Sequence, residues 1–317
     1  MFALCIESSH VRGMGHFYRA LNLAEGLAAA GISYKFYLND HAPSLKILRE
    51  RGVPHQVVKL EDYSGNWEAS LIQQDSITLW LNDRLDTDLR HTEKIKAVGT
   101  PLVTLDDRGA GATLADLHIA ALAFDEQECL GGSKLLRGPD YLILNPEISA
   151  YTRLRKQLAN ILVTLGGSDT YGVTVRVVQL LKEMNLTATI VVGPAFMHRD
   201  MLNAVLTKGF TLKRGVPSLI AEFHRHDLAI TGGGITPFEA NASGLPCVVI
   251  ANEQFEIPVG VALQKLGGSL FAGHHEAMSL PLFRTDLPLE QMSQAGMRNI
   301  GLQGTQRVIS ALLGLVK

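Results

Sequence analysis

The sequence contains little cysteine and no long apolar run, and we expect no signal peptide. Its three cysteines, Cys5, Cys129 and Cys247, lie far apart and form no C-x-x-C pair. We expect buried thiols in a reducing compartment, because a disulfide framework needs closely patterned cysteines. No apolar stretch reaches the ~20 residues that a membrane-spanning helix needs, and no basic segment of a signal peptide precedes the first apolar run. The sequence therefore predicts a soluble, cytoplasmic protein without membrane insertion.

The chain also lacks a basic tract. Its 29 lysines and arginines are balanced by 31 aspartates and glutamates, which gives a formal net charge of −2. A nucleic-acid partner is therefore not expected, since such proteins carry clustered basic residues. The histidines are not spaced with carboxylates or cysteines as metal ligands are, so we expect neither a metal nor another cofactor. We expect a monomer that binds a small molecule.

Short apolar runs alternate with amphipathic helical patterns through almost the whole chain. This alternation predicts βαβ units and hence α/β domains with parallel sheets. The expected strands are 2–6, 33–38, 55–58, 77–81, 102–105, 117–119, 160–165, 188–192, 211–213, 228–231 and 247–251. The expected helices are 15–30, 43–51, 68–74, 86–97, 173–184, 198–206, 217–223, 237–242 and 257–266, followed by one or two helices within 289–316.

With 317 residues, of which 46% are hydrophobic, the chain is long enough for two domains. The stretch 124–145 has little helical periodicity and several glycine and proline pairs, which are typical of a crossover between domains. We therefore expect an N-terminal domain at 1–145 and a C-terminal domain at 146–317, whose last helix could cross back. Two doubly wound, Rossmann-like domains facing a cleft would bring the carboxyl ends of both sheets, where ligands bind, to one site.

A glycine turn near the N-terminus carries a candidate catalytic residue. Gly13-Met14-Gly15-His16 lies between an expected strand and an expected helix, so His16 falls in or just before the first helical turn. The positive end of the helix dipole disfavours a protonated imidazole, which makes His16 a candidate general base. The alternative is a tight turn in which the histidine caps the helix. This stretch alone does not separate the two interpretations, because short glycine motifs have many false positives.

Two further glycine turns occur in the second half of the chain. Gly166-Gly167-Ser168 and Gly232-Gly233-Gly234 each follow an expected strand and precede an expected helix. Backbone N–H groups in such turns can bind phosphate without a metal. Neither turn has the spacing of a nucleoside-triphosphatase P-loop or of the dinucleotide-binding motif. Two such turns in one domain favour a nucleotide diphosphate.

Carboxylates at two places could contribute to a site. Glu239 lies about one turn into the helix that follows Gly234, where an ionised carboxylate could accept hydrogen bonds from two ribose hydroxyls. The alternative for Glu239 is a solvated helix charge that favours the helix dipole. Asp106-Asp107-Arg108 follows the strand at 102–105 and could supply acid and base groups, or simply an Asp–Arg pair in a loop.

In their order along the chain, these stretches resemble the UDP-sugar hydrolases of pseudaminic acid biosynthesis. Those enzymes hydrolyse a UDP-activated diacetamido-trideoxy sugar and are relatives of GT-B glycosyltransferases of the family 28 type, such as the peptidoglycan N-acetylglucosaminyltransferase. The resemblance covers nearly the whole chain. The matching segments are Gly13-Met14-Gly15-His16 with Arg19 and Leu23-Ala24, Asp106-Asp107, Gly138-Pro139-Asp140-Tyr141 with 142–147, 161–169, 191–196 and 230–246.

The resemblance implies a GT-B fold, with UDP held mainly by the C-terminal domain. It implies a metal-independent attack of water on the anomeric carbon with inversion and with UDP as the leaving group. His16 matches the histidine that activates the water. The residues that would bind UDP or the sugar are Gly13, Gly15, Arg19, Asp107, Gly166, Gly167, Ser168, Gly232, Gly233, Gly234, Thr236, Glu239, Glu253 and Gln254.

Two departures from the family pattern lie where the sugar would bind. The family often has an Asn-Gln pair where this chain has Asn252-Glu253-Gln254, and an Asp-x-Tyr where this chain has Asn82-Asp83-Arg84 without a tyrosine. The leading hypothesis is a nucleotide-sugar hydrolase in surface-glycan biosynthesis of the nonulosonic acid type. The alternatives are a GT-B glycosyltransferase with a UDP-sugar donor and a non-catalytic relative that only binds the nucleotide sugar.

Overall fold

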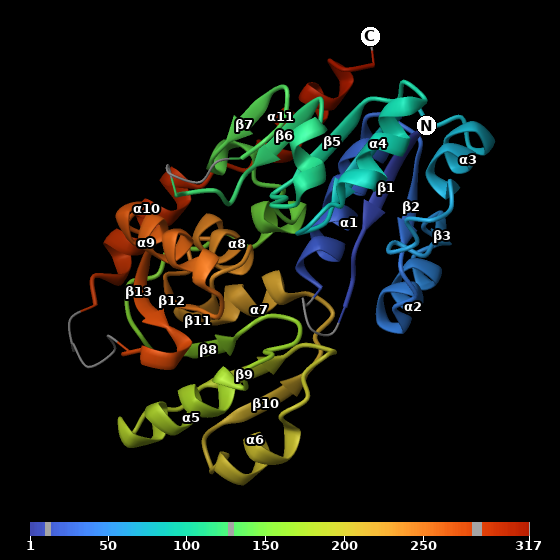
Figure 1. Cartoon of the computed structure of the whole chain (residues 1–317). Helices are drawn as coiled ribbons and strands as arrows, with labels where there is room; N and C mark the ends of the chain where they lie inside the picture. The colour runs from blue at the N-terminus through green and yellow to red at the C-terminus, as the bar shows by residue number, and fades with distance from the viewer. Residues whose placement is uncertain (10–13, 126–129, 281–286, 317) are drawn as a thin grey trace. The chain divides into compact units, whose positions relative to one another are not determined.

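The computed structural model describes residues 1–9, 14–125, 130–280 and 287–316 (Figure 1). It contains a seven-stranded sheet of order β3-β2-β1-β4-β5-β6-β7 and a six-stranded sheet of order β10-β9-β8-β11-β12-β13. The strand pairs in both sheets are parallel. The α/β class with two parallel, Rossmann-like sheets is therefore confirmed.

The chain divides into two compact units, of which the first contains Met1–Ser9, His16–Ile143 and Gln303–Lys317. Its strands are β1 (Phe2–Ile6), β2 (Tyr34–Leu38), β3 (His55–Val57), β4 (Leu79–Asp83), β5 (Leu102–Leu105), β6 (Leu117–Ala120) and β7 (Leu135–Arg137). Its helices are α1 (Gly15–Ala29), α2 (Ala42–Glu50), α3 (Trp67–Gln74), α4 (Leu89–Ala97) and α11 (Gly304–Leu313), with short 3-10 turns η1 (Ala110–Leu114) and η2 (Pro139–Tyr141).

The second unit contains Leu144–Leu302. Its strands are β8 (Ile161–Thr164), β9 (Thr189–Val192), β10 (Thr211–Arg214), β11 (Leu228–Gly232), β12 (Cys247–Ala251) and β13 (Ser269–His274). Its helices are α5 (Val173–Glu183), α6 (Arg199–Val205), α7 (Leu219–Arg225), α8 (Thr236–Ala242), α9 (Ile257–Lys265) and α10 (Leu289–Asn299), with 3-10 turns η3 (Pro146–Ala150), η4 (Gln254–Glu256) and η5 (His275–Ala277).

The inner strands of each sheet are buried along their whole length, as in β1, β4, β11 and β12. Helices cover parallel sheets on both faces, so their central strands read as continuous apolar runs. That is why the expected strands 2–6, 102–105 and 247–251 have the observed bounds. Burial of such runs supplies most of the folding free energy, at about 25 cal/mol per Å² of apolar surface.

The differences from the expected elements lie at sheet edges and strand ends. β7 falls inside the stretch expected to be a crossover without structure, because three half-exposed residues at an edge carry no clear period. β13 was not expected, and its pairing with β12 is irregular near Gly273, which has a φ of +96°. β4 extends to Asp83, beyond the expected end at 81.

Two of the cysteines are buried free thiols, Cys5 in β1 and Cys247 in β12. Burial raises the pKa of Cys5 to about 12 and also raises the pKa of Cys247. Since the thiolate is the reactive form, neither thiol is suited to nucleophilic chemistry. Cys129 lies outside the described residues.

Within the described part of the chain, none of the helices combines the length and apolar character that crossing a bilayer requires.

Candidate active site

The candidate site of the first unit is built where β1, β4 and β5 end. Ile6 pairs with Asp83, and Asn82 pairs with Thr104, so the carboxyl ends of the three strands lie next to one another. Parallel α/β sheets bind ligands at this edge. Asp83 closes β4 and Asp106 follows β5, while α1 contributes His16 and Arg19. The four side chains form one network.

His16 and Asp83 form a hydrogen-bonded pair. The Nδ1 atom of His16 lies 2.6 Å from Oδ1 of Asp83. An ionised carboxylate can only accept, so the imidazole proton is assigned to Nδ1, which leaves Nε2 as the basic nitrogen. The Asp83 side chain is 0% exposed, whereas the His16 side chain is 18% exposed. The pair has the geometry of a general base oriented by a buried carboxylate.

Arg19 holds the carboxylates of this network together. Its Nε donates to Oδ2 of Asp83 at 2.9 Å, its Nη2 donates to Oδ1 of Asp83, and its Nη1 donates to Asp106. The side chain is only 6% exposed. Burial would lower the pKa of Arg19, but the two carboxylates outweigh it and raise that pKa. Arg19 was expected to bind the substrate, yet its guanidinium is engaged in positioning Asp83.

The charge of Asp83 is maintained in spite of its burial. Burial would raise the pKa of its carboxyl group, but the charge of Arg19 and the hydrogen bonds from His16 and Arg19 lower it below the ordinary value. Asp83 is therefore ionised at neutral pH. Removing one partner of a buried pair leaves an uncompensated charge, which costs about 3–5 kcal/mol.

Asp106 adopts a left-handed backbone conformation with a φ of +46°. Its N–H donates to the carbonyl of Ile119 at 2.9 Å, and its Oδ1 accepts the N–H of Leu122 at 2.8 Å. These contacts to β6 and the residues after it hold a conformation that a non-glycine residue adopts rarely. Strained residues of this kind concentrate at functional sites.

Asp107 differs from its neighbour in position and contacts. Its carboxylate accepts the N–H groups of Thr87 at 3.0 Å and of Gly109 at 2.9 Å, and also the hydroxyl of Thr87. It is buried, and burial raises its pKa. Asp107 was expected at the substrate, but its oxygens are engaged in holding the segment between β4 and α4. Asp106 is the carboxylate that joins the His16 network.

A buried polar network explains why β4 continues past its apolar run. Asn82 accepts from Nε1 of Trp80 at 2.9 Å, and its Oδ1 lies 3.2 Å from Nε2 of His91. His91 in turn contacts Glu68 through Nδ1 at 2.9 Å. Burial is the main cause that lowers the pKa of His91, while its hydrogen bond to Glu68 opposes the shift. The network fixes the last residues of β4 and thereby the backbone of Asp83.

Sequence reasoning missed Asp83 as a functional residue and treated its segment only as a departure from a family pattern. One signal could have indicated it: in a doubly wound sheet the strand beside β1 ends next to the start of α1. A carboxylate at that end is within reach of a histidine in the first turn of α1. Gly13 lies outside the described residues. Gly15 begins α1, and a Cβ there would meet nothing within 4 Å.

In the second unit, the Gly166-Gly167-Ser168 turn follows β8, and Gly166 has a φ of +91°. The carbonyl of Gly167 accepts the N–H of Ala195 at 3.1 Å. The carboxylate of Asp169 accepts the N–H groups of Val173 at 2.8 Å and Thr174 at 2.9 Å, which are the first of α5. The helix start is thus capped by its own aspartate. A phosphate bound here would have to use N–H groups of the turn itself.

The Gly232-Gly233-Gly234 turn connects β11 to α8, which begins at Thr236. Glu239 in α8 is 9% exposed, and its Oε1 accepts the N–H of Asn145 at 3.1 Å. Burial raises the pKa of Glu239 to about 7. Glu239 is therefore not a solvated helix charge. A carboxyl group with this pKa is ionised above neutral pH, where it can accept hydrogen bonds from hydroxyl groups.

Glu253 and Gln254 follow β12. Glu253 accepts the hydroxyl of Tyr171 at 2.8 Å, and the Tyr171 ring stacks on His275 with 4.3 Å between the ring centroids. Gln254 begins η4 and is exposed. Glu253 thus stands at the carboxyl edge of the second sheet as an acceptor, held by a tyrosine from the segment after the first glycine turn of this unit.

Glu239→Gln is expected to change how stability depends on pH. A carboxyl group whose folded pKa lies above its ordinary value of 4.5 stabilises the fold below that value, and this contribution is lost as pH rises through about 7. At pH 8 the variant should therefore be up to about 3 kcal/mol more stable than wild type, at 1.36 kcal/mol per pKa unit. At pH 4 the two should be equal.

Urea unfolding at the two pH values measures this difference, and Glu276→Gln is the control because that side chain is 75% exposed. An identical pH slope in wild type and Glu239→Gln would contradict the buried position of Glu239.

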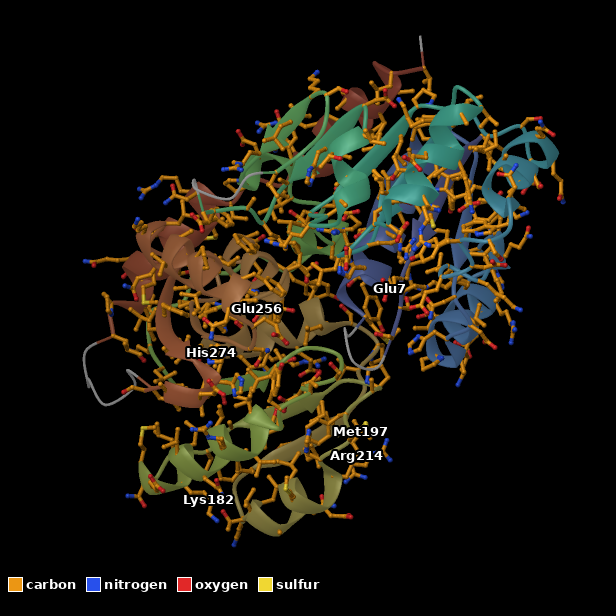
Figure 2. The ribbon with its side chains drawn as sticks, viewed as in Figure 1. Glu7, Lys182, Met197, Arg214, Glu256 and His274 are labelled. Atoms are coloured by element: carbon orange, nitrogen blue, oxygen red, sulfur yellow. The ribbon has the colours of Figure 1, made fainter. Side chains whose placement is uncertain are left out.

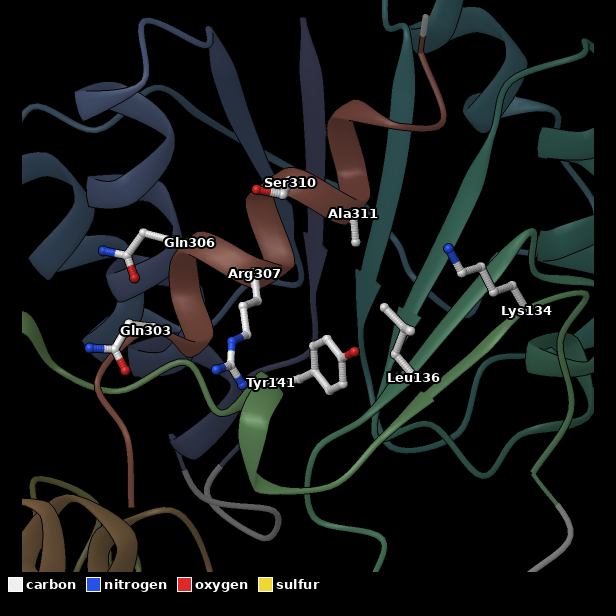
Figure 3. Close-up of a pocket in the computed structure, with 8 residues that line it drawn as sticks. All are labelled: Lys134, Leu136, Tyr141, Gln303, Gln306, Arg307, Ser310 and Ala311. Carbon is white, nitrogen blue, oxygen red and sulfur yellow. The ribbon is translucent and has the colours of Figure 1, made fainter. Parts of the chain in front are cut away.

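A cavity of about 460 Å³ lies elsewhere in the first unit (Figure 3). Tyr141 of η2 and Leu136 of β7 line it opposite α11, from which Arg307 reaches toward Tyr141. None of the residues expected at the site lines this cavity. Among the described residues, no group of three or more His, Cys, Asp or Glu side chains could hold a metal ion.

Comparison with known proteins supports the fold. No protein-family model matches the sequence. The spore coat polysaccharide biosynthesis protein SpsG of Bacillus subtilis is 27% identical over 284 residues, which cover 84% of this chain and 82% of that protein. The uncharacterized protein MJ1062 of Methanocaldococcus jannaschii is 27% identical over 278 residues, or 80% of this chain. The match covers 56% of MJ1062, so the chain spans about half the length of that relative.

Solved structures with the same fold include two that align with nearly the whole chain. MurG of Acinetobacter baumannii aligns over 99% of both chains with a TM-score of 0.68 and 13% identity. The glycosyltransferase VinC in complex with dTDP covers 100% of this chain and 99% of its own, with a TM-score of 0.66 and 13% identity. We conclude that the chain has the GT-B fold.

Proposed function

We propose that this protein is a nucleotide-sugar hydrolase that releases UDP and a free amino or deoxy sugar. The observation that carries the proposal is the His16–Asp83 pair, in which a buried, ionised carboxylate holds Nδ1 at 2.6 Å and leaves Nε2 of His16 basic. Such a pair can act as a general base that takes a proton from a water molecule or from a weakly acidic hydroxyl group of a substrate. The similarity to SpsG favours a role in polysaccharide biosynthesis.

The proposed reaction is a single displacement. Nε2 of His16 accepts a proton from water while the water oxygen attacks the anomeric carbon, and the bond from that carbon to the diphosphate oxygen breaks. The imidazolium that forms is stabilised by Asp83, whose lowered pKa keeps it ionised. General base action of this kind contributes ~10²–10⁴-fold in rate. The free sugar has the inverted anomeric configuration.

Features of the second unit support a nucleotide as the leaving group. Its glycine turns, at Gly166 and at Gly232, offer backbone N–H groups to a diphosphate. The ionised form of Glu239 could accept both ribose hydroxyls, and its pKa of about 7 makes that form available near neutral pH. VinC, which shares the fold, was solved with dTDP. The proposal also includes uridine as the nucleoside of the leaving nucleotide.

The second candidate function is glycosyl transfer, in which His16 deprotonates an acceptor hydroxyl in place of water. Its support is that MurG and VinC have the same fold and that VinC is a glycosyltransferase. A third candidate is a non-catalytic protein that binds a nucleotide sugar. It is motivated by the two departures from the family pattern, at Asn82-Asp83-Arg84 and at Glu253.

One assay separates the three candidates. The protein is incubated with a panel of UDP-, dTDP-, GDP- and CMP-sugars without any acceptor, and nucleotide and free sugar are both quantified. The proposal predicts equal amounts of UDP and free sugar over many turnovers. Turnover only after an acceptor is added would indicate a transferase, and tight binding without turnover would indicate a binding protein.

A further inference from the structure

Glu256, labelled in Figure 2, belongs to η4. Its side chain lies beside the Gly232-Gly233-Gly234 turn, where a Cβ added at Gly233 would come close to it. Its Oε2 accepts the N–H of Asn252 at 2.7 Å and, more weakly, the N–H of Glu253 at 3.4 Å. The same oxygen lies close to Gly233, since a Cβ added there would be 3.1 Å from it. The turn that was expected to offer its N–H groups to a phosphate therefore already has a side-chain carboxyl group of the protein beside it.

The approach of Glu256 depends on the glycine. A Cβ added at Gly233 would lie 2.7 Å from Cβ of Glu256 and 3.1 Å from its Oε2. The side chain is partly buried at this place. Burial raises the pKa of Glu256, while the N–H groups of Asn252, Glu253 and Gly233 oppose that rise. The carboxylate is thus a built part of the turn and not a mobile surface charge.

A second carboxylate lies near Glu256. Glu253 lies near enough to raise the pKa of Glu256. Both carboxylates, together with Glu276, also raise the pKa of Tyr171, although its hydrogen bond to Glu253 is the larger cause. A site selected for the tightest phosphate binding would place cations here. The observed arrangement opposes a strongly anionic ligand.

We infer that Glu256 is an affinity-determining residue of the nucleotide site: its carboxylate lies against the glycine turn and repels the diphosphate, so that the released nucleotide diphosphate dissociates readily. This inference rests on the proposed function. Product release limits the turnover of many enzymes. A carboxylate next to the diphosphate weakens the binding of UDP, which keeps its full charge after the reaction. It weakens the binding of an uncharged nucleoside less.

Glu256→Gln tests this inference, because the amide keeps the size of the side chain and one acceptor oxygen for the N–H groups. Calorimetry at pH 8 would compare the binding of UDP and of uridine. Two like charges a few ångströms apart near a protein surface repel strongly enough to change affinity about tenfold. We expect the variant to bind UDP about tenfold more tightly and uridine with unchanged affinity. The gain should shrink as salt is added.

The matched control is Glu276→Gln, which removes a carboxylate of the same sheet edge that has no contact with the glycine turn; its effect on UDP should be much smaller. Glu256→Ala is the second variant and should also tighten UDP. Unchanged or weaker UDP binding in both Glu256 variants would overturn the inference while leaving the proposed function intact. A wild-type protein that binds neither UDP nor uridine would overturn both.

Discussion

Replacing His16 by alanine is expected to slow UDP release from the nucleotide sugar by about 10²–10⁴-fold, the range of a lost general base. UDP should still bind with wild-type affinity, because the groups proposed to hold it belong to the second unit. The fold should persist, since Arg19 continues to neutralise Asp83 in the absence of the imidazole. Single-turnover measurement of UDP release, combined with calorimetry of UDP binding, checks both expectations.

His55→Ala is the matched control, because His55 lies in the same unit on the edge strand β3. The interaction described for its side chain is a contact of Nδ1 with the carbonyl of Val53. It should turn over at the wild-type rate. If His16→Ala retained wild-type turnover, His16 would not be the base and the proposed mechanism would be wrong.

Asp83→Asn is the change with the second-largest expected effect. A neutral amide no longer fixes the proton of the His16 ring on Nδ1, and it cannot stabilise the imidazolium that forms during the reaction. The turnover rate should therefore fall by about 10²–10⁴-fold with little change in KM. Arg19 also loses a charged partner that is 0% exposed, so the free energy of unfolding should fall by about 3–5 kcal/mol. Activity must therefore be expressed per folded molecule, from circular dichroism and thermal melting.

Asp107→Asn separates a catalytic loss from a structural one. Asp107 is buried in the same unit and accepts from Thr87 and Gly109, but it has no hydrogen bond to His16. Its replacement should lower stability without a selective loss of turnover per folded molecule. If both variants lost activity only in proportion to their unfolded fraction, Asp83 would be a structural residue and not the partner of the base.

The alternation of apolar runs and amphipathic helices was sufficient to predict the fold class. Central strands such as β1 and β12 are buried on both faces, so their apolar runs have the length of the strands. The edge strand β7 is half exposed and has no such run. Its pairing depends on β6, which local sequence does not encode.

The candidate site was predictable only in part. His16 follows a glycine turn, which is a local signal. Asp83 depends on long-range contacts, because its strand is extended by the hydrogen bonds of Asn82 to Trp80 and His91. Asp106 and Asp107 are neighbours in sequence, and only the left-handed conformation of Asp106 shows which of them meets Arg19.

The glycine turns show a similar limit. The sequence indicates where backbone N–H groups are exposed by glycine, but it does not show which of them are already bonded. Asp169 accepts the first N–H groups of α5, and Glu256, which lies against Gly233, accepts those of Asn252 and Glu253. Both contacts come from side chains whose positions are set by the three-dimensional fold.

The central claim is that His16 activates water for attack on the anomeric carbon. Its most direct test is turnover in water enriched in oxygen-18, with the first-formed sugar followed by proton NMR and both products by mass spectrometry. The account predicts one UDP per free sugar, an inverted anomeric configuration, and oxygen-18 on the anomeric carbon. Oxygen-18 in UDP, or a sugar with retained configuration, would contradict it.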